Sequence, residues 1–83
     1  MIKTFVAENL KVLRKRRRQT QEEVSSIFHC TRSTYNNYEN NISMTPLDIL
    51  VLSSDYYGIT LDNLVKVDLH ILNEYQLREI LKK

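Results

Sequence analysis

Two short helical patterns occupy the segment from Thr20 to Asn41, and only three residues separate them. Thr20 and Glu23 have the spacing of a capping box, in which each side chain accepts a hydrogen bond from the backbone N–H of the other residue. A helix over about 21–28 is therefore predicted. One side of this helix must face a core, because its apolar residues recur at three- and four-residue spacing: Val24, Ile27 and Phe28.

A second helix is predicted over about 32–39, because Thr31 is a suitable N-cap for it. Since only residues 29–31 connect the two helices, they must cross at a fixed angle. Tyr35 and Tyr38 share one face of the second helix. The opposite face carries only hydrogen-bonding side chains: Arg32, Ser33, Asn36 and Asn37. A merely solvated face would more often carry Lys and Glu, whereas the DNA major groove is read by donors and acceptors such as those of Arg and Asn.

This segment resembles the helix-turn-helix of the lambda-repressor and Cro family, also called the XRE type. The matching residues are 20–24, 31–34 and 37–40, and the likeness extends over about residues 5–65. The resemblance implies an all-α fold, in which residues 1–65 form a five-helix lambda-repressor-like DNA-binding domain and residues 32–39 are its recognition helix. The composition agrees with a helical domain, because the chain has one Gly, one Pro and 42% apolar residues.

Two longer helices are predicted on either side of this pair. The first spans about residues 4–17. The second begins after Thr45 as N-cap, with Pro46 in its first turn, and Gly58 ends it in a left-handed cap. Its buried side is predicted from four residues: Leu47, Leu50, Val51 and Tyr57.

A fifth, short helix is predicted over 61–65, because Thr60 is a good N-cap for it. The chain also departs from the family pattern in two ways. His29 and Asn41 lie where the family usually has glycine, and Asn adopts a left-handed backbone more readily than His does. In the predicted fourth helix, two polar residues lie where the family has an aliphatic residue and an alanine: Ser53 and Ser54.

Residues 66–83 form a segment beyond the five predicted helices. An additional amphipathic helix is predicted there, with an apolar side that includes Leu69, Leu72, Tyr75 and Ile80. Such a helix needs a surface to cover. It either folds back on the domain and completes the core, or pairs with the same helix of a second chain in a homodimer, the assembly that suits palindromic operators.

Positive charge is concentrated in the first half of the chain. Residues 1–41 carry eight Lys and Arg against four acids, whereas residues 42–83 carry four against six. Six of these cations, Lys11 and Arg14 to Arg18, lie near the end of the first predicted helix. We expect Arg17 and Arg18 to contact DNA phosphates, although a solvated face or cations complementing the helix dipole would explain the same cluster.

The resemblance implies a role for each residue that matches the family pattern. Base contacts are expected from Arg32, Ser33 and Asn37, with Asn36 and Thr34 at neighbouring bases or at the DNA backbone. Phosphate contacts are expected from the start of the first helix of the pair and from the end of the recognition helix: Gln21, Asn40, Asn41 and Ser43. Arg14 and Glu39 are expected to form a partly buried ion pair between the first helix and the recognition helix.

The chemistry of other functional classes has little support in this sequence. Cys30 is the single cysteine, and no spacing of Cys and His indicates a metal site, a disulfide framework or a catalytic pair, so we expect neither an enzyme nor a cofactor. No apolar run is long enough to cross a bilayer, no small-molecule site is evident, and a cytoplasmic protein is expected.

The sequence therefore predicts a transcription regulator, specifically a bacterial or phage repressor that binds a palindromic operator in double-stranded DNA as a homodimer. An alternative from another class keeps the same fold. In it, the chain is a protein-binding module, such as an antitoxin or antirepressor, which uses its C-terminal helix to bind a partner protein.

Overall fold

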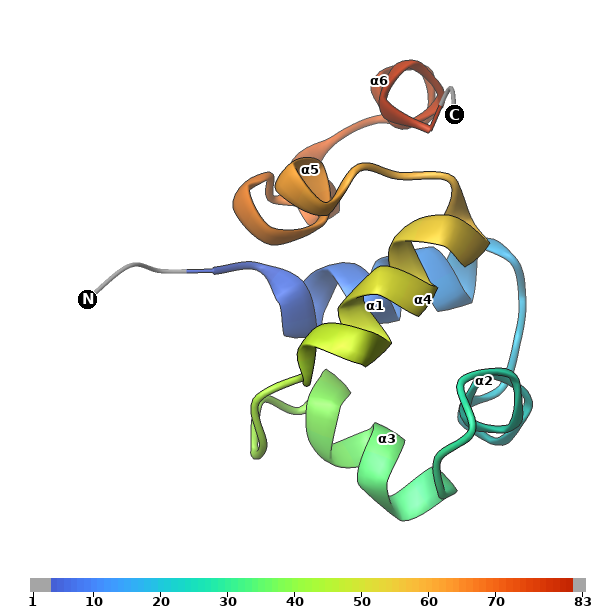
Figure 1. Ribbon diagram of the computed structural model, residues 1–83. Coiled ribbons are helices and arrows are strands. Elements are labelled where there is room, and N and C mark those ends of the chain that lie inside the picture. The colour runs from blue at the N-terminus through green and yellow to red at the C-terminus, as the bar shows by residue number, and fades with distance from the viewer. Residues whose placement is uncertain (1–3, 82–83) are drawn as a thin grey trace.

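The computed structural model describes residues 4–81, and all regular secondary structure in this range is helical. The elements, in chain order, are α1 (Val6–Arg16), α2 (Gln21–Ile27), α3 (Arg32–Glu39), α4 (Leu47–Tyr57), α5 (Leu61–Lys66), the 3₁₀ turn η1 (Leu69–Ile71) and α6 (Glu74–Ile80). In Figure 1, α1 lies at the centre and α4 crosses in front of it, with α2 and α3 on one side and α5 and α6 on the other. The predicted all-α fold is confirmed.

Three predicted helix starts are confirmed by their capping hydrogen bonds. Thr20, Thr31 and Thr60 each accept a hydrogen bond from the backbone N–H three residues later, and Thr20 and Glu23 complete the capping box. The predicted start of α4 is wrong by one residue. Pro46 has an extended backbone (ψ 157°) and is itself the N-cap, so Thr45 lies outside the helix and makes no cap.

The predicted buried side of α4 is wrong for two of its four residues. Leu50 packs partly against the core. Tyr57 is buried as predicted, but Leu47 and Val51 are exposed, and the buried positions are taken instead by Ile49, Ser53 and Ser54. The two serines tolerate burial because the Ser53 hydroxyl donates to the carbonyl oxygen of Ile49 (2.7 Å) and that of Ser54 donates to the carbonyl oxygen of Ile59. Apolar residues occur on nearly all sides of α4, so spacing alone did not identify its buried face.

The core is built around aromatic side chains from three helices. Phe28 is buried and lies 6.3 Å, centroid to centroid, from both Tyr35 and Tyr57. Leu10 and Leu13 from α1 and Val24 from α2 join the same cluster, together with Ile59 and Leu64. The packing between the rings fixes the positions of α2 and α3 relative to α4.

The predicted additional C-terminal helix is present as α6, but it covers only Glu74–Ile80 and leaves out the predicted helix residues Leu69 and Leu72. Extended backbone at Val67 and Leu72 separates α5, η1 and α6, and Asn73 begins α6 with a capping box to Gln76. Leu69 and Leu77 are buried in the core. Leu72 and Ile80 pack partly against the core, whereas Tyr75 is exposed. Most of the predicted apolar side of this segment is therefore covered by the same chain.

Asn9 on α1 holds this segment in place, and sequence reasoning missed it. The Asn9 side chain is fully buried. Its Nδ2 atom donates to the carbonyl oxygens of Leu64 and Val67, both at 2.7 Å, and its Oδ1 atom accepts from the backbone N–H of Leu69 at 3.0 Å. One amide thus joins α1 to the end of α5 and the start of η1. Nothing local in the sequence marks a polar residue on an apolar helix face as such a connector.

The first three helices end in residues with a left-handed backbone that are not glycine. Arg18, His29 and Asn41 have φ values of 58°, 61° and 58°, whereas Gly58 (φ 67°) has this role after α4. His29 and Asn41 therefore adopt the left-handed backbone at the two positions where the family usually has glycine, and the positive φ at Arg18 was not predicted. After α2, the N–H of Cys30 donates to the carbonyl oxygen of Ser25 and that of His29 to the carbonyl oxygen of Ser26, the Schellman pattern.

Replacing His29 by glycine is expected to raise the free energy of unfolding by about 1 kcal/mol. A left-handed backbone costs a non-glycine residue about 1 to 2 kcal/mol, which glycine avoids. The larger conformational entropy of glycine in the unfolded chain offsets part of this stabilisation. Urea unfolding measures the change. His29→Val is the control and should be less stable than the original chain, because a β-branched residue adopts a positive φ poorly. A glycine variant less stable than the original chain would contradict the prediction.

Candidate nucleic-acid interface

The large apolar side chains of α3 are buried in the core, and the outward side of the helix is polar. Tyr35 and Tyr38 are buried, and Arg32 and Ser33 are exposed at the start of the helix. Thr34, Asn36 and Asn37 are partly exposed. An open hollow of about 480 Å³ lies at this end of the helix pair, lined by Gln21, Arg32, Ser33 and Asn36. The structure therefore brings the predicted phosphate contact of α2 next to three of the predicted base contacts.

Glu39 connects the polar surface to the interior. Its carboxylate accepts from Arg14 Nε at 2.7 Å, from Arg14 Nη2 at 3.0 Å and from Gln21 Nε2 at 3.2 Å. Arg14 Nη1 also donates to the carbonyl oxygen of Gln19 at 2.9 Å, so each of the three guanidinium nitrogens donates a hydrogen bond. Burial alone would raise the pKa of Glu39, but the hydrogen bonds from Arg14 and Gln21 hold it below its ordinary value. The pair fixes the orientation of α3 on α1 and positions the Gln21 side chain.

Side-chain hydrogen bonds also order the polar face of α3. Asn40 Nδ2 donates to Asn36 Oδ1 at 3.1 Å, one helical turn away. Thr34 is held by Thr31, because the Thr31 hydroxyl donates to Thr34 Oγ1 at 2.9 Å. Asn37 takes part through its backbone, because its carbonyl oxygen accepts hydrogen bonds from the loop after α3. Thr34 is hydrogen-bonded to the N-cap residue Thr31 through both its hydroxyl and its backbone N–H.

The loop after α3 is held close to the recognition helix. The backbone N–H groups of Ile42 and Ser43 both donate to the carbonyl oxygen of Asn37, at 2.9 and 3.3 Å. The left-handed backbone of Asn41 makes this return possible. Asn40, Asn41 and Ser43 are all exposed there. The predicted second group of phosphate contacts therefore lies together at one end of α3.

In the basic cluster at the end of α1, Arg16 and Arg17 contact other helices of the chain. The Arg17 guanidinium lies 4.5 Å from the centroid of the Tyr56 ring and donates to the Tyr56 carbonyl oxygen at 3.0 Å. Arg16 forms an ion pair with Glu74 of α6 at 2.7 Å. Lys15, Arg16, Arg17 and Arg18 are all exposed. Of the two predicted phosphate contacts, Arg17 already joins α1 to α4, a contact that the sequence did not reveal.

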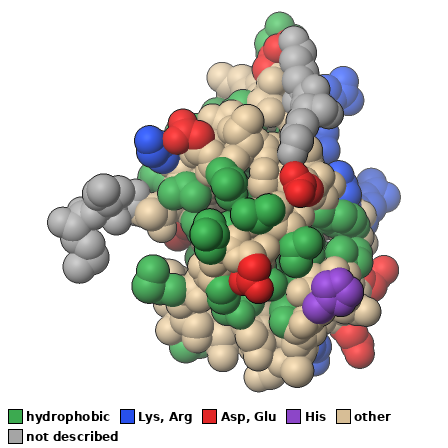
Figure 2. Space-filling view, in the orientation of Figure 1, with side chains coloured by type: hydrophobic (Ala, Val, Ile, Leu, Met, Phe, Trp, Pro, Cys, Tyr) green, Lys and Arg blue, Asp and Glu red, His purple; other side chains and the backbone are tan. Residues whose placement is uncertain are grey.

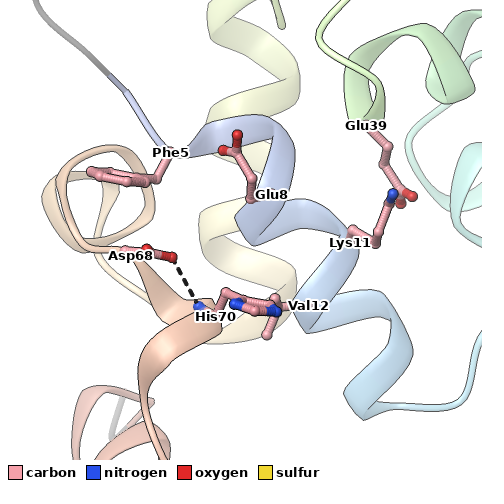
Figure 3. A pocket seen from close by; sticks show the side chains of 7 residues that line it. All are labelled: Phe5, Glu8, Lys11, Val12, Glu39, Asp68 and His70. Atoms are coloured by element: carbon pink, nitrogen blue, oxygen red, sulfur yellow. Dashed lines mark hydrogen bonds between the residues drawn. The ribbon is translucent and has the colours of Figure 1, made fainter.

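A second hollow, of about 470 Å³, lies along the other side of α1, between η1 and the end of α3. Figure 3 shows Glu8, Lys11 and Val12 from α1 along it, with Asp68 and His70 from the C-terminal segment opposite, where the His70 backbone N–H donates to Asp68. Glu39 also lines it, but the Glu39 carboxylate is bound to Arg14 and Gln21. This hollow lies outside the predicted interface.

Within residues 4–81, no group of three or more His, Cys, Asp or Glu side chains is arranged to hold a metal ion. Burial raises the pKa of the Cys30 thiol, which disfavours the reactive thiolate at neutral pH. None of the helices described here is long and apolar enough to cross a membrane.

Comparison with known proteins identifies the family. A family model described as a helix-turn-helix domain matches residues 7–82. Among solved structures, a transcriptional regulator from Listeria innocua shares the fold, with a TM-score of 0.75 and 20% sequence identity over 94% of this chain and 73% of that chain. A search of curated proteins found no match. Because the family match spans nearly the whole chain, the chain belongs to the XRE-type helix-turn-helix family of DNA-binding domains.

Proposed function

We propose that this chain is a sequence-specific transcription regulator, and specifically a repressor that binds a palindromic operator as a two-fold homodimer in the cytoplasm. One observation carries the proposal: the outward face of α3 consists of hydrogen-bonding side chains and adjoins Gln21 across an open hollow, while the opposite face is buried. Such a helix is suited to enter a major groove and read base edges. The role is one of binding and not of catalysis.

In this proposal, one group of residues contacts the bases and another group contacts the phosphate backbone. Arg32, Ser33 and Asn37 contact bases in this proposal, with Asn36 and Thr34 at the edge of the same surface. Gln21 and Arg18 hold one stretch of the phosphate backbone. A second stretch is held by the loop after α3: Asn40, Asn41 and Ser43. Selection of bound duplexes from a random pool tests the proposal and should yield half-sites about 34 Å apart, related by two-fold symmetry. Failure to enrich any sequence would contradict it.

Replacing Asn37 or Arg32 by alanine is expected to relax the preference at one base pair of each half-site by about 1 to 3 kcal/mol. Asn37→Ala keeps the carbonyl oxygen that holds Ile42 and Ser43, so the loop should stay in place. The measurement is repeated selection with each variant, together with binding to unselected DNA. Lys66→Ala, on the exposed surface of α5, is the control. Equal losses on selected and unselected DNA would remove Asn37 and Arg32 from base readout.

Replacing Arg18 by asparagine is expected to lower affinity for all sequences and to reduce the slope of log K against log salt by about one unit. Asparagine removes the charge but tolerates the left-handed backbone of this position. Lys66→Gln removes an equal charge from α5, beside the start of α1 and away from Arg18, and should leave the slope unchanged. If both variants changed the slope equally, net charge alone would explain the effect and Arg18 would have no special role.

The alternative is a protein-binding module that acts as an antitoxin or antirepressor. It draws support from Ile71 and Tyr75, which leave apolar surface exposed on the C-terminal segment. The random-pool selection separates the two proposals, because a module that only masks a partner protein enriches no DNA sequence.

A further inference from the structure

The loop between α1 and α2, residues 17–20, contacts one residue near the end of α4. Gln19 Nε2 donates to the Tyr56 hydroxyl oxygen at 2.6 Å. The Arg17 guanidinium donates to the Tyr56 carbonyl oxygen at 3.0 Å and lies 4.5 Å from the centroid of the Tyr56 ring. Figure 2 shows Lys and Arg side chains at the right-hand edge of the molecule, where Figure 1 places this loop beside the end of α4. Tyr56 therefore contacts the loop through its hydroxyl, its ring and its backbone.

Neighbouring aromatic rings hold Tyr56 in position. Its ring packs edge-to-face on that of Phe28, with the centroids 5.7 Å apart, and its centroid lies 5.0 Å from that of Tyr57. The Tyr56 side chain packs partly against the core. Because packed rings have little freedom to move, the Tyr56 hydroxyl is a fixed point for the loop.

The backbone of Gln19 is fixed from the side of α1. Its N–H donates to the carbonyl oxygen of Arg14 at 3.2 Å, and its carbonyl oxygen accepts from Arg14 Nη1 at 2.9 Å. Gln19 is thus bound by α1 through its backbone and by α4 through its side chain. Consecutive Cα atoms are only about 3.8 Å apart, so fixing Gln19 also restricts where Arg18 and Gln21 can lie.

Arg18 and Gln21 are the two residues that the proposed function assigns to one stretch of the phosphate backbone. Arg18 has a φ of 58°, a left-handed conformation that is unfavourable for a residue other than glycine. Such strain persists only where surrounding contacts hold it, and it is concentrated at functional sites. Here both neighbours of Arg18 in the chain, Arg17 and Gln19, contact Tyr56.

We propose that Tyr56 is a positioning residue for phosphate binding. The hydrogen bond that its hydroxyl accepts from Gln19 keeps the Arg18 and Gln21 side chains in place to meet the DNA backbone. Tyr56 itself does not touch DNA. A loop that is already ordered loses less conformational freedom on binding, and this raises affinity. The inference rests on the proposed function for its ligand, double-stranded DNA, and adds a residue of α4 to those that determine affinity.

Fluorescence anisotropy of the full chain with a duplex from the random-pool selection, and with an unselected duplex, tests this proposal. Tyr56→Phe removes the hydroxyl and keeps the ring that packs on Phe28 and Arg17. It should lower affinity for both duplexes about threefold or more, because the loop loses a hydrogen bond that orders it. The slope of log K against log salt should become shallower, because phosphate contacts are weakened.

Gln19→Met removes the other partner of the same hydrogen bond and should give a similar loss of affinity. The double variant with Tyr56→Phe should lose no more than either single variant, because both substitutions remove one interaction. Losses that add in the double variant would show that Tyr56 does not act through Gln19.

Tyr57→Phe is the matched control. It removes a hydroxyl from the next residue of α4, and this hydroxyl has no hydrogen-bond partner among residues 4–81. The control should therefore bind both duplexes like the original chain. Urea unfolding of each variant separates folding from positioning. A merely structural role of Tyr56 would lower the unfolding midpoint and leave the affinity and the salt slope of the folded chain unchanged.

Three further results would overturn the proposal: an unchanged affinity in Tyr56→Phe, an equal loss in Tyr57→Phe, or a loss confined to the selected duplex, which would place Tyr56 in base readout. Each of these results leaves the proposed function intact, because the original chain still binds DNA. An original chain that enriches no sequence and binds no unselected duplex contradicts the proposed function itself, so the two failures are distinguishable.

Discussion

Replacing Glu39 by alanine is expected to lower the free energy of unfolding by about 3 to 5 kcal/mol, because it leaves the charge of a largely buried arginine without its partner. The Glu39 side chain is fully buried and that of Arg14 is 12% exposed. The loss is a large part of the roughly 5 to 15 kcal/mol that stabilises a typical domain. Urea unfolding at neutral pH measures it.

Two further variants test the cause of this loss. Arg14→Met with Glu39→Leu removes both charges and should recover much of the stability, since an apolar pair of similar volume needs no partner. Removing the exposed pair of Arg16 and Glu74 should change stability little, because solvent screens such a pair. A Glu39→Ala chain as stable as the original would show that the pair does not hold α3 on α1.

The ion pair of Arg14 and Glu39 should also make the stability of the chain depend on pH. The pKa of Glu39 is lowered in the folded chain from its reference value of 4.5. Its contribution is therefore fully present above that reference pKa and is lost as the pH falls through the lower folded pKa. The difference in unfolding midpoint between the original chain and the Arg14→Met, Glu39→Leu chain should shrink in this acidic range. Glu23 and Glu74 also have lowered pKa values, but they are present in both chains and cancel.

Replacing Asn9 by alanine is expected to cost about 3 kcal/mol, because two buried backbone groups and one partly buried group lose their partner and each unsatisfied buried group costs about 1 to 3 kcal/mol. The groups are the carbonyl oxygens of Leu64 and Val67 and the N–H of Leu69. Hydrogen exchange should show the first loss of protection at Leu69 and in α6, since Asn9 joins these elements to α1. An exchange pattern changed equally in α2 and α3 would contradict this local role.

Asn9→Asp provides a sharper version of the same experiment. Aspartate keeps the shape of the side chain, but its second oxygen would face two carbonyl oxygens at the positions where Nδ2 now donates at 2.7 Å. The charged form should be strongly destabilising at neutral pH, and the neutral acid, which can donate one hydrogen bond, less so. Asn36→Ala is the control, because Asn36 makes its hydrogen bond on the surface. Similar effects of Asn9→Asp and Asn9→Ala at all pH values would exclude the proposed contacts.

The elements that sequence reasoning located correctly all have local signals. Thr20, Thr31 and Thr60 cap helices whose first residues lie directly beside them in the chain. The two positions noted as departures from the family glycines, His29 and Asn41, both have a left-handed backbone directly after a helix. Such interactions span three to six residues, so the information needed to predict them is contained within a single turn.

The errors occur where the deciding contact comes from a distant part of the chain. Leu47 and Val51 were expected to be buried because they are aliphatic, yet the packing of α4 on the core selects the side with Ser53 and Ser54. The predicted C-terminal helix included Leu69 and Leu72, but the backbone is extended at Val67 and Leu72, and the Asn9 side chain binds the backbone of Val67 and Leu69. Hydrophobic periodicity is a property of one helix at a time, so it does not show which other elements pack against that helix.

The sequence by itself determined where the recognition helix begins and ends and which polar side chains it presents, because capping and helical periodicity act over one or two turns. Only the tertiary structure decided which arginines are held by contacts within the chain, which face of α4 is buried, and how the C-terminal segment is held. Arg14 pairs with Glu39, Arg16 with Glu74 and Arg17 with Tyr56, across separations of 25, 58 and 39 residues. Contacts of that range form only when the whole chain has packed, and they can therefore be seen only in the folded molecule.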